Sequence, residues 1–177
     1  MPINMKNCCV VVIITLFVFN CTALAQKRPA QAFRLGATIS FALTNIASNN
    51  VGIGGIAGAE KPVSKNFSVE AEMSYTYFTG DKAIYTDGKN RAFTLPVVAG
   101  IKFYPLSNIY GSLRTGAVYF MLNEMTSPKI RPCYGIAGGI NLPEKTNRVN
   151  IQLSYTGFHY QSVTRGYTTL AAAIIIN

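Results

Sequence analysis

Apolar and polar residues alternate one by one through long stretches of this chain. In FSVEAEMSYTY, which starts at Phe67, apolar residues occupy the odd positions. Two carboxylates, Glu70 and Glu72, share the even positions with serine and threonine. Successive side chains of a strand point to opposite sides, so this pattern predicts one apolar face and one polar face. No segment longer than a turn or two has the 3.6-residue period of a helix, and we therefore predict an all-β protein.

Eight segments have this strand character, and each is ended by turn residues. They cover residues 32–43, 51–60, 67–78, 92–104, 109–122, 132–142, 149–160 and 167–176. The connections after the first, third and fifth segments are longer or less compact than those after the second, fourth and sixth. Long loops on one side and short turns on the other are typical of outer-membrane barrels, whose tilted strands need about 9–11 residues to cross the bilayer. The expected fold is an eight-stranded antiparallel up-and-down transmembrane β-barrel.

The amino terminus has the three parts of a secretory signal peptide. Lys6 precedes an apolar run at residues 9–19, and the small-x-small sequence Ala23-Leu24-Ala25 follows it. That run is shorter than the roughly 20 apolar residues of a transmembrane helix. We expect residues 1–25 to be removed by cleavage after Ala25, leaving a barrel of residues 26–177 in the cell outer membrane. Cys133 is then the one remaining cysteine, so no internal disulfide is expected.

Aromatic residues gather near the ends of the predicted strands, as in the two aromatic girdles of a membrane barrel. This set comprises Tyr75, Tyr77, Phe78, Phe103, Tyr104, Tyr110, Tyr119, Phe120, Tyr160 and Tyr167. Core aromatics of a soluble antiparallel domain are the alternative, because such a domain turns its apolar face inward. A soluble exported barrel that holds a ligand therefore stays open beside the membrane barrel.

If the apolar faces meet lipid, the polar faces point into the barrel and place six charged residues there. They are Arg34, Glu60, Glu70, Glu72, Lys102 and Arg114. Neighbouring strands lie about 4.8 Å apart, which puts the two glutamates of the third strand within reach of Lys102 and Arg114. An eight-stranded barrel is only wide enough for side chains to fill, and charges in such an interior need partners. We predict a structural charge network that fills the lumen.

Paired carboxylates also serve in general acid–base catalysis, but no nucleophile with a base and no metal-ligand spacing accompanies Glu70 and Glu72. Outer-membrane lipid A deacylases use a histidine and a nearby serine. Here Ser162 follows His159 by three residues, which places them on opposite faces of a regular strand. A phosphate-binding loop opens a helix, but no helical pattern follows the glycine-rich VGIGGIAG at residues 51–58. We expect a non-enzymatic barrel without cofactor, with a lipid-modifying enzyme and a narrow small-solute pore as alternatives.

The stretch LPVVAGIKFYPLSNIYG, from Leu95 to Gly111, and the later TNRVNIQLSYTGFHY resemble the small outer-membrane β-barrel domain proteins of Bacteroidetes-type bacteria. The resemblance implies an integral outer-membrane protein. The ending AAAIIIN departs from the terminal aromatic residue that many such barrels use as an assembly signal. We expect a monomer whose partners are outer-membrane lipids, including lipopolysaccharide, and the outer-membrane assembly machinery. Export and the lack of a basic cluster interleaved with aromatics argue against nucleic acid as a partner.

Overall fold

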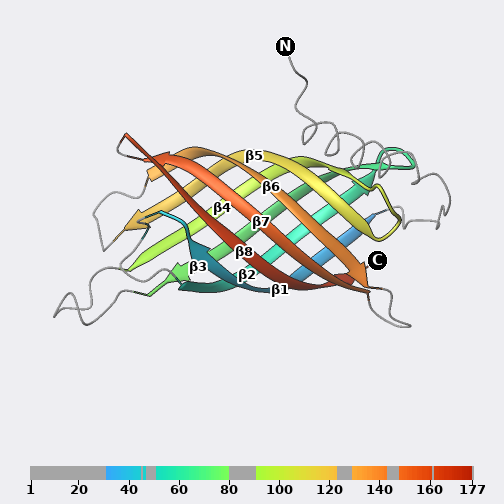
Figure 1. Ribbon diagram of the computed structural model, residues 1–177, viewed down its shortest axis with the longest axis horizontal. Helices are drawn as coiled ribbons and strands as arrows, with labels where there is room; N and C mark the ends of the chain where they lie inside the picture. Colours follow the sequence, from blue (N-terminus) through green and yellow to red (C-terminus); the bar gives the residue numbers. More distant parts are fainter. Residues whose placement is uncertain are drawn as a thin grey trace, which may run out of the picture.

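Eight antiparallel strands follow one another in chain order and close into a barrel, because β8 pairs with β1 (Figure 1). The computed structural model describes residues 31–44, 46, 51–79, 91–122, 129–142, 148–160 and 162–176. The strands are β1 (Ala32–Ala42), β2 (Val51–Pro62), β3 (Phe67–Phe78), β4 (Ala92–Phe103), β5 (Ile109–Leu122), β6 (Lys129–Leu142), β7 (Arg148–Tyr160) and β8 (Val163–Ile176). The predicted all-β barrel is confirmed, whereas the predicted signal peptide lies outside the described residues.

Two strands begin three or more residues earlier than the sequence pattern predicted. β6 starts at Lys129 rather than Pro132, and β8 starts at Val163 rather than Tyr167. Tyr160 pairs directly with Val163, so the last two strands form a tight hairpin. Ser162 in its turn has a positive φ of 61°. Such a turn usually carries glycine, asparagine or aspartate, and their absence hid this hairpin from sequence reasoning.

The outer wall of the barrel is apolar. The most exposed large side chains include Leu35, Ile53, Leu113 and Ile130, each more than 60% accessible. Each lies on the face opposite the inward-pointing polar residues of its own strand, as the alternation predicted. None of the described residues forms a helix long and apolar enough to cross a membrane.

The aromatic residues divide between the two faces, and this corrects the predicted girdles. Outward rings do form contacts: Phe93 packs against Tyr75 and Tyr119, with centroids 5.0 and 5.6 Å away, and Phe67 packs against Phe103. Six of the ten expected girdle residues are instead buried, namely Phe78, Tyr104, Tyr110, Phe120, Tyr160 and Tyr167. Each lies an even number of residues from an inward-facing residue nearby, so strand periodicity overrides position near a strand end.

The barrel interior is filled by two kinds of side chain. We call the end with the β2–β3, β4–β5 and β6–β7 connections the turn end, and the opposite end the loop end. Charged and polar residues, together with the rings of Tyr104 and Tyr110, fill the half nearest the turn end, whereas the other buried rings fill the half nearest the loop end. Between them, the Ser40 hydroxyl lies 2.8 Å from the Thr169 hydroxyl and 3.2 Å from the Thr76 hydroxyl.

Candidate functional site

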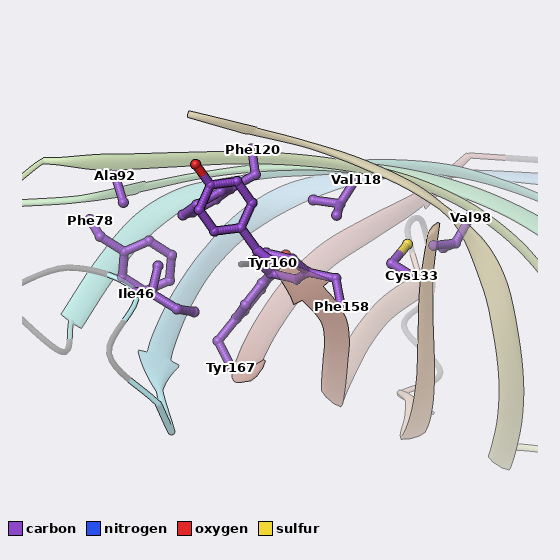
Figure 2. Close-up of a cluster of buried hydrophobic side chains, with 10 residues drawn as sticks. All are labelled: Ile46, Phe78, Ala92, Val98, Val118, Phe120, Cys133, Phe158, Tyr160 and Tyr167. Carbon is purple, nitrogen blue, oxygen red and sulfur yellow. The ribbon is translucent and has the colours of Figure 1, made fainter. Parts of the chain in front are cut away.

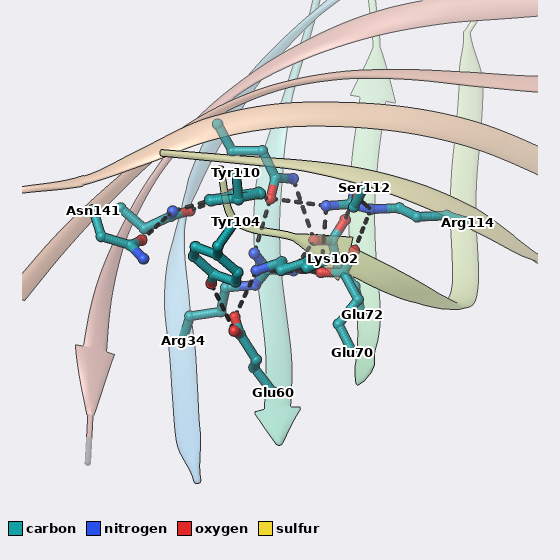
Figure 3. A network of polar contacts seen from close by, with 12 residues as sticks. Arg34, Glu60, Glu70, Glu72, Lys102, Tyr104, Tyr110, Ser112, Arg114 and Asn141 are labelled. Atoms are coloured by element: carbon teal, nitrogen blue, oxygen red, sulfur yellow. Dashed lines mark hydrogen bonds and ion pairs between the residues drawn. The ribbon is translucent and has the colours of Figure 1, made fainter. Parts of the chain in front are cut away.

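Two glutamates from β3 form the centre of the charged half, and an arginine approaches them from each side (Figure 3). Arg34 from β1 donates to Glu70 at 2.7 Å and also to Glu72. Arg114 from β5 donates through Nε to Glu70 at 2.8 Å and through Nη1 to Glu72 at 2.7 Å. Both guanidinium groups therefore bridge both carboxylates, an arrangement of charge-assisted hydrogen bonds that fixes four side chains together.

Gln152 from β7 completes this centre, and its side chain is fully buried. Its Oε1 accepts from Arg34 Nη1 at 2.8 Å and from Arg114 Nη2 at 2.9 Å. The Tyr110 hydroxyl donates to the same oxygen at 2.8 Å, and Gln152 Nε2 donates to Glu72 at 3.2 Å. The sequence analysis did not predict Gln152, because only charged residues were considered as members of the network. The alternation in β7 already placed it on the inward face between Asn150 and Ser154.

Lys102 from β4 lies closer to the turn end and is 1% exposed. Its Nζ lies 2.8 Å from Glu60, 3.4 Å from Glu70 and 4.2 Å above the Tyr110 ring. Glu60 also accepts a hydrogen bond of 2.6 Å from the Tyr104 hydroxyl. Burial and the nearby Glu60 carboxylate raise the pKa of Tyr104, which follows β4, so its hydroxyl stays a donor. The structure thus brings all six sequence-predicted charged residues together, with Lys102 next to Glu60 and Glu70.

Glycines opposite the two arginines make room for their side chains. Gly58 pairs with Arg34 across β1 and β2, and Gly100 pairs with Arg114 across β4 and β5. A Cβ atom at Gly58 would lie 2.7 Å from Arg34 Nε, and one at Gly100 would lie 3.0 Å from Arg114 Cγ. Gly58, in the glycine-rich segment of β2, therefore makes room for a side chain of the lumen.

The described interior leaves little room for a solute. A cavity of about 10 Å³ adjoins Glu72 and Arg114, and one of about 20 Å³ adjoins Lys102 near the turn end. Cavities of this size have room for about one water molecule. Glu70 and Glu72 are buried and bound to both arginines, so a substrate cannot reach them in this arrangement. Within the described ranges, no group of three or more His, Cys, Asp or Glu residues could hold a metal ion.

The two residues considered for a lipid-modifying enzyme lie near the end of β7 and in the turn that follows it. His159 is exposed on the outer wall, and its Nδ1 lies 3.5 Å from the Thr164 hydroxyl on β8. Ser162 lies in the turn between β7 and β8. Cys133 points inward and packs in the aromatic half of the lumen.

The loop-end half of the lumen is an aromatic cluster (Figure 2). Phe120 lies within ring contact of Phe158 and Tyr160, at centroid distances of 5.2 and 5.1 Å. Phe78 meets the edge of Tyr167 at 5.7 Å. Ile46, from the connection between β1 and β2, is 1% exposed and belongs to the same cluster. The cluster therefore seals the lumen above the charge network.

No family model matches the sequence, and no curated protein matches it. Several solved structures share the fold. Neisserial surface protein A aligns with a TM-score of 0.60 at 13% identity, covering 85% of this chain and 99% of that chain. Ail of Yersinia pestis aligns with a TM-score of 0.55 at 13% identity, covering 84% and 100%. The amino-terminal barrel domain of OprF of Pseudomonas aeruginosa aligns with a TM-score of 0.55 at 13% identity, covering 82% of this chain and 97% of that chain.

At these identities the likeness establishes the fold. This chain has the eight-stranded barrel fold of outer-membrane proteins. Ail has also been solved in complex with the heparin analogue sucrose octasulfate.

Proposed function

We propose that this chain is an integral outer-membrane protein of the Bacteroidetes-type barrel family, with a closed lumen and a non-enzymatic role at the cell surface. The observation that carries the proposal is the distribution of side chains. Apolar residues cover the outer wall, while buried charges and hydroxyl groups occupy much of the interior. A soluble antiparallel barrel has the opposite distribution, because water solvates its polar face.

The extent of the apolar wall argues against a soluble ligand-holding barrel. Exposed large apolar residues occur on every one of the eight strands. Soluble monomers rarely expose contiguous apolar patches larger than a few hundred Å². A bilayer removes this surface from water, and the outward rings around Phe93 and Phe103 then act as interfacial aromatics.

The proposed role follows from the contrast between the packed lumen and the loop end. The lumen is packed with paired charges and rings, so it serves to hold the barrel together rather than to conduct. The loop end then offers the contact surface for partners outside the cell. Lipopolysaccharide around the wall and sulfated sugars at the loop end are the candidate partners, the latter by analogy with the ligand of Ail. In this proposal the signal peptide spans residues 1–25, and the mature barrel is a monomer.

Refolding of residues 26–177 into detergent micelles tests this proposal. We expect β-dominated circular dichroism and a faster-migrating band on a gel loaded without heating. In planar bilayers the folded protein should give no steady, sizeable single-channel conductance. A chain that remains soluble and monomeric without detergent, or one that conducts steadily, would contradict the proposal.

A further inference from the structure

Three cations from β6 and β8 face the barrel axis at the loop end. Lys129 pairs with Phe120, Arg131 pairs with Val118, and Arg165 pairs with Phe158. Directly paired residues of antiparallel strands project on the same face of the sheet. Because the three partners are buried inside the barrel, their cationic neighbours lie on the inward face near the mouth.

Two of these cations are held against the aromatic cluster. The Arg131 guanidinium carbon lies 5.9 Å from the centroid of the Tyr160 ring. That of Arg165 lies 5.4 Å from the same centroid and 5.9 Å from that of Phe120. All three distances are within the range of cation–π attraction. The rings therefore restrict the two guanidinium groups to neighbouring positions against the aromatic cluster. This restriction lowers the entropic cost of binding one ligand with both groups.

The charge of this end is positive even when the connecting segments are counted. The three acidic residues within the described ranges, Glu60, Glu70 and Glu72, belong to the network nearer the turn end. By sequence, the loop end carries six cations and three acidic residues: Lys82, Lys89, Arg91, Lys129, Arg131 and Arg165 against Asp81, Asp87 and Glu124. A mouth with an excess of positive charge attracts negatively charged ligands over several ångströms.

We propose that Arg131 and Arg165 form a binding site for the sulfate or phosphate groups of a soluble glycan that enters the barrel mouth along its axis. The planar fork of a guanidinium group matches the paired oxygens of a sulfate or phosphate. The inward direction of the side chains favours a ligand from outside the cell over lipid phosphates, which would surround the outer wall. This inference rests on the proposed orientation of the barrel, with its loop end outward.

Binding to folded protein in nanodiscs of zwitterionic lipid, and in parallel nanodiscs that also contain anionic lipid, tests the inference. The probes are sucrose octasulfate, inositol hexakisphosphate and uncharged sucrose, and the Kd is measured by calorimetry at two salt concentrations. The wild-type protein should bind both polyanions, more weakly at high salt, and should not bind sucrose. The double variant Arg131→Gln, Arg165→Gln should weaken polyanion binding at least about tenfold, through loss of two charge-assisted contacts.

Matched controls separate this site from general charge attraction. Lys61→Gln with Lys65→Gln removes two exposed cations at the turn end and should change Kd by less than about twofold, because screening limits the reach of distant charges. The variant Arg131→Lys, Arg165→Lys should retain more binding than the glutamine variant. Heat-dependent gel mobility shows that each variant is folded.

Three results would overturn the inference: no polyanion binding by folded wild-type protein, equal losses in the two glutamine variants, or binding that appears only with anionic lipid in the nanodisc. Each leaves the proposed membrane barrel intact. A protein that fails to fold in detergent would instead refute the proposed function.

Discussion

The two halves of the lumen are both filled by side chains, but different kinds of contact stabilise them. The turn-end half uses charges in directional contacts, with both arginines bridging Glu70 and Glu72. The loop-end half uses rings such as Phe120 and Phe158, which stabilise mainly by the non-directional hydrophobic effect. A buried charge that loses its partner is left uncompensated, whereas a ring can be exchanged for another apolar group of similar volume. The first half should therefore tolerate substitution poorly and the second half well.

The largest effect is expected for Arg114→Ala. It removes one of the two cations that bridge the glutamates and leaves their charge partly uncompensated in a buried site. The free energy of unfolding should fall by about 3–5 kcal/mol, as for other broken buried ion pairs. Urea unfolding in lipid vesicles measures it. The control Lys61→Ala, on an exposed side chain of β2, should stay within about 0.5 kcal/mol of the wild type.

A double-mutant cycle sharpens the account of the charged half. Glu72 and Arg114 are 2.7 Å apart, whereas Lys102 pairs with Glu60 and Glu70. The coupling free energy between Glu72 and Arg114 should fall in the range of about 0.5–3 kcal/mol found for residues in contact. The cycle between Glu72 and Lys102 should give a smaller value. A larger coupling for the second pair would show that the register of the network differs from this structure.

The smallest effect is expected for Phe158→Leu in the aromatic half. Leucine keeps this site apolar but loses the ring contact with Phe120 at 5.2 Å. The free energy of unfolding should fall by about 0.5–1.5 kcal/mol, the value of an aromatic pair beyond its buried area. The same vesicle unfolding assay applies. A cost equal to that of Arg114→Ala would remove the predicted difference between the two halves.

Alternation was sufficient to predict the number of strands and the six inward charges of the network. It missed the inward cations Lys129, Arg131 and Arg165, because they lie where β6 and β8 begin earlier than predicted. It could not predict the pairing of the six network charges, because a contact between strands depends on register and on how the barrel is sheared. Lys102 illustrates this: its sequence position suggested both glutamates of β3, but Glu60 from β2 lies nearest. Gln152 escaped notice for a related reason, since it carries no charge and reaches the network from the far wall of the barrel.

The aromatic half was missed although the signal was present. Tyrosine and phenylalanine near strand ends were assigned to the membrane interfaces from their position along the strand. Their parity placed Phe78, Phe120 and Tyr167 on the inward face, where the structure has them. The early start of β8 was harder to predict, because the two residues between β7 and β8 are glutamine and serine rather than the glycine, asparagine or aspartate that usually mark such a hairpin. The early start of β6 was hidden by Ser127, Pro128 and Pro132, which are typical of a loop.

The central claim is that lipid covers the outer wall while both halves of the lumen are packed and shielded from it. The sequence contains no tryptophan, so an introduced one gives an unambiguous fluorescence signal. Met73→Trp places the probe on the outer wall, where Met73 is 47% exposed, and Phe120→Trp places it in the aromatic cluster. In vesicles of brominated lipid, the tryptophan at position 73 should be strongly quenched and that at position 120 should keep most of its emission. Equal quenching at the two positions, or stronger quenching at 120, would contradict this account of the barrel.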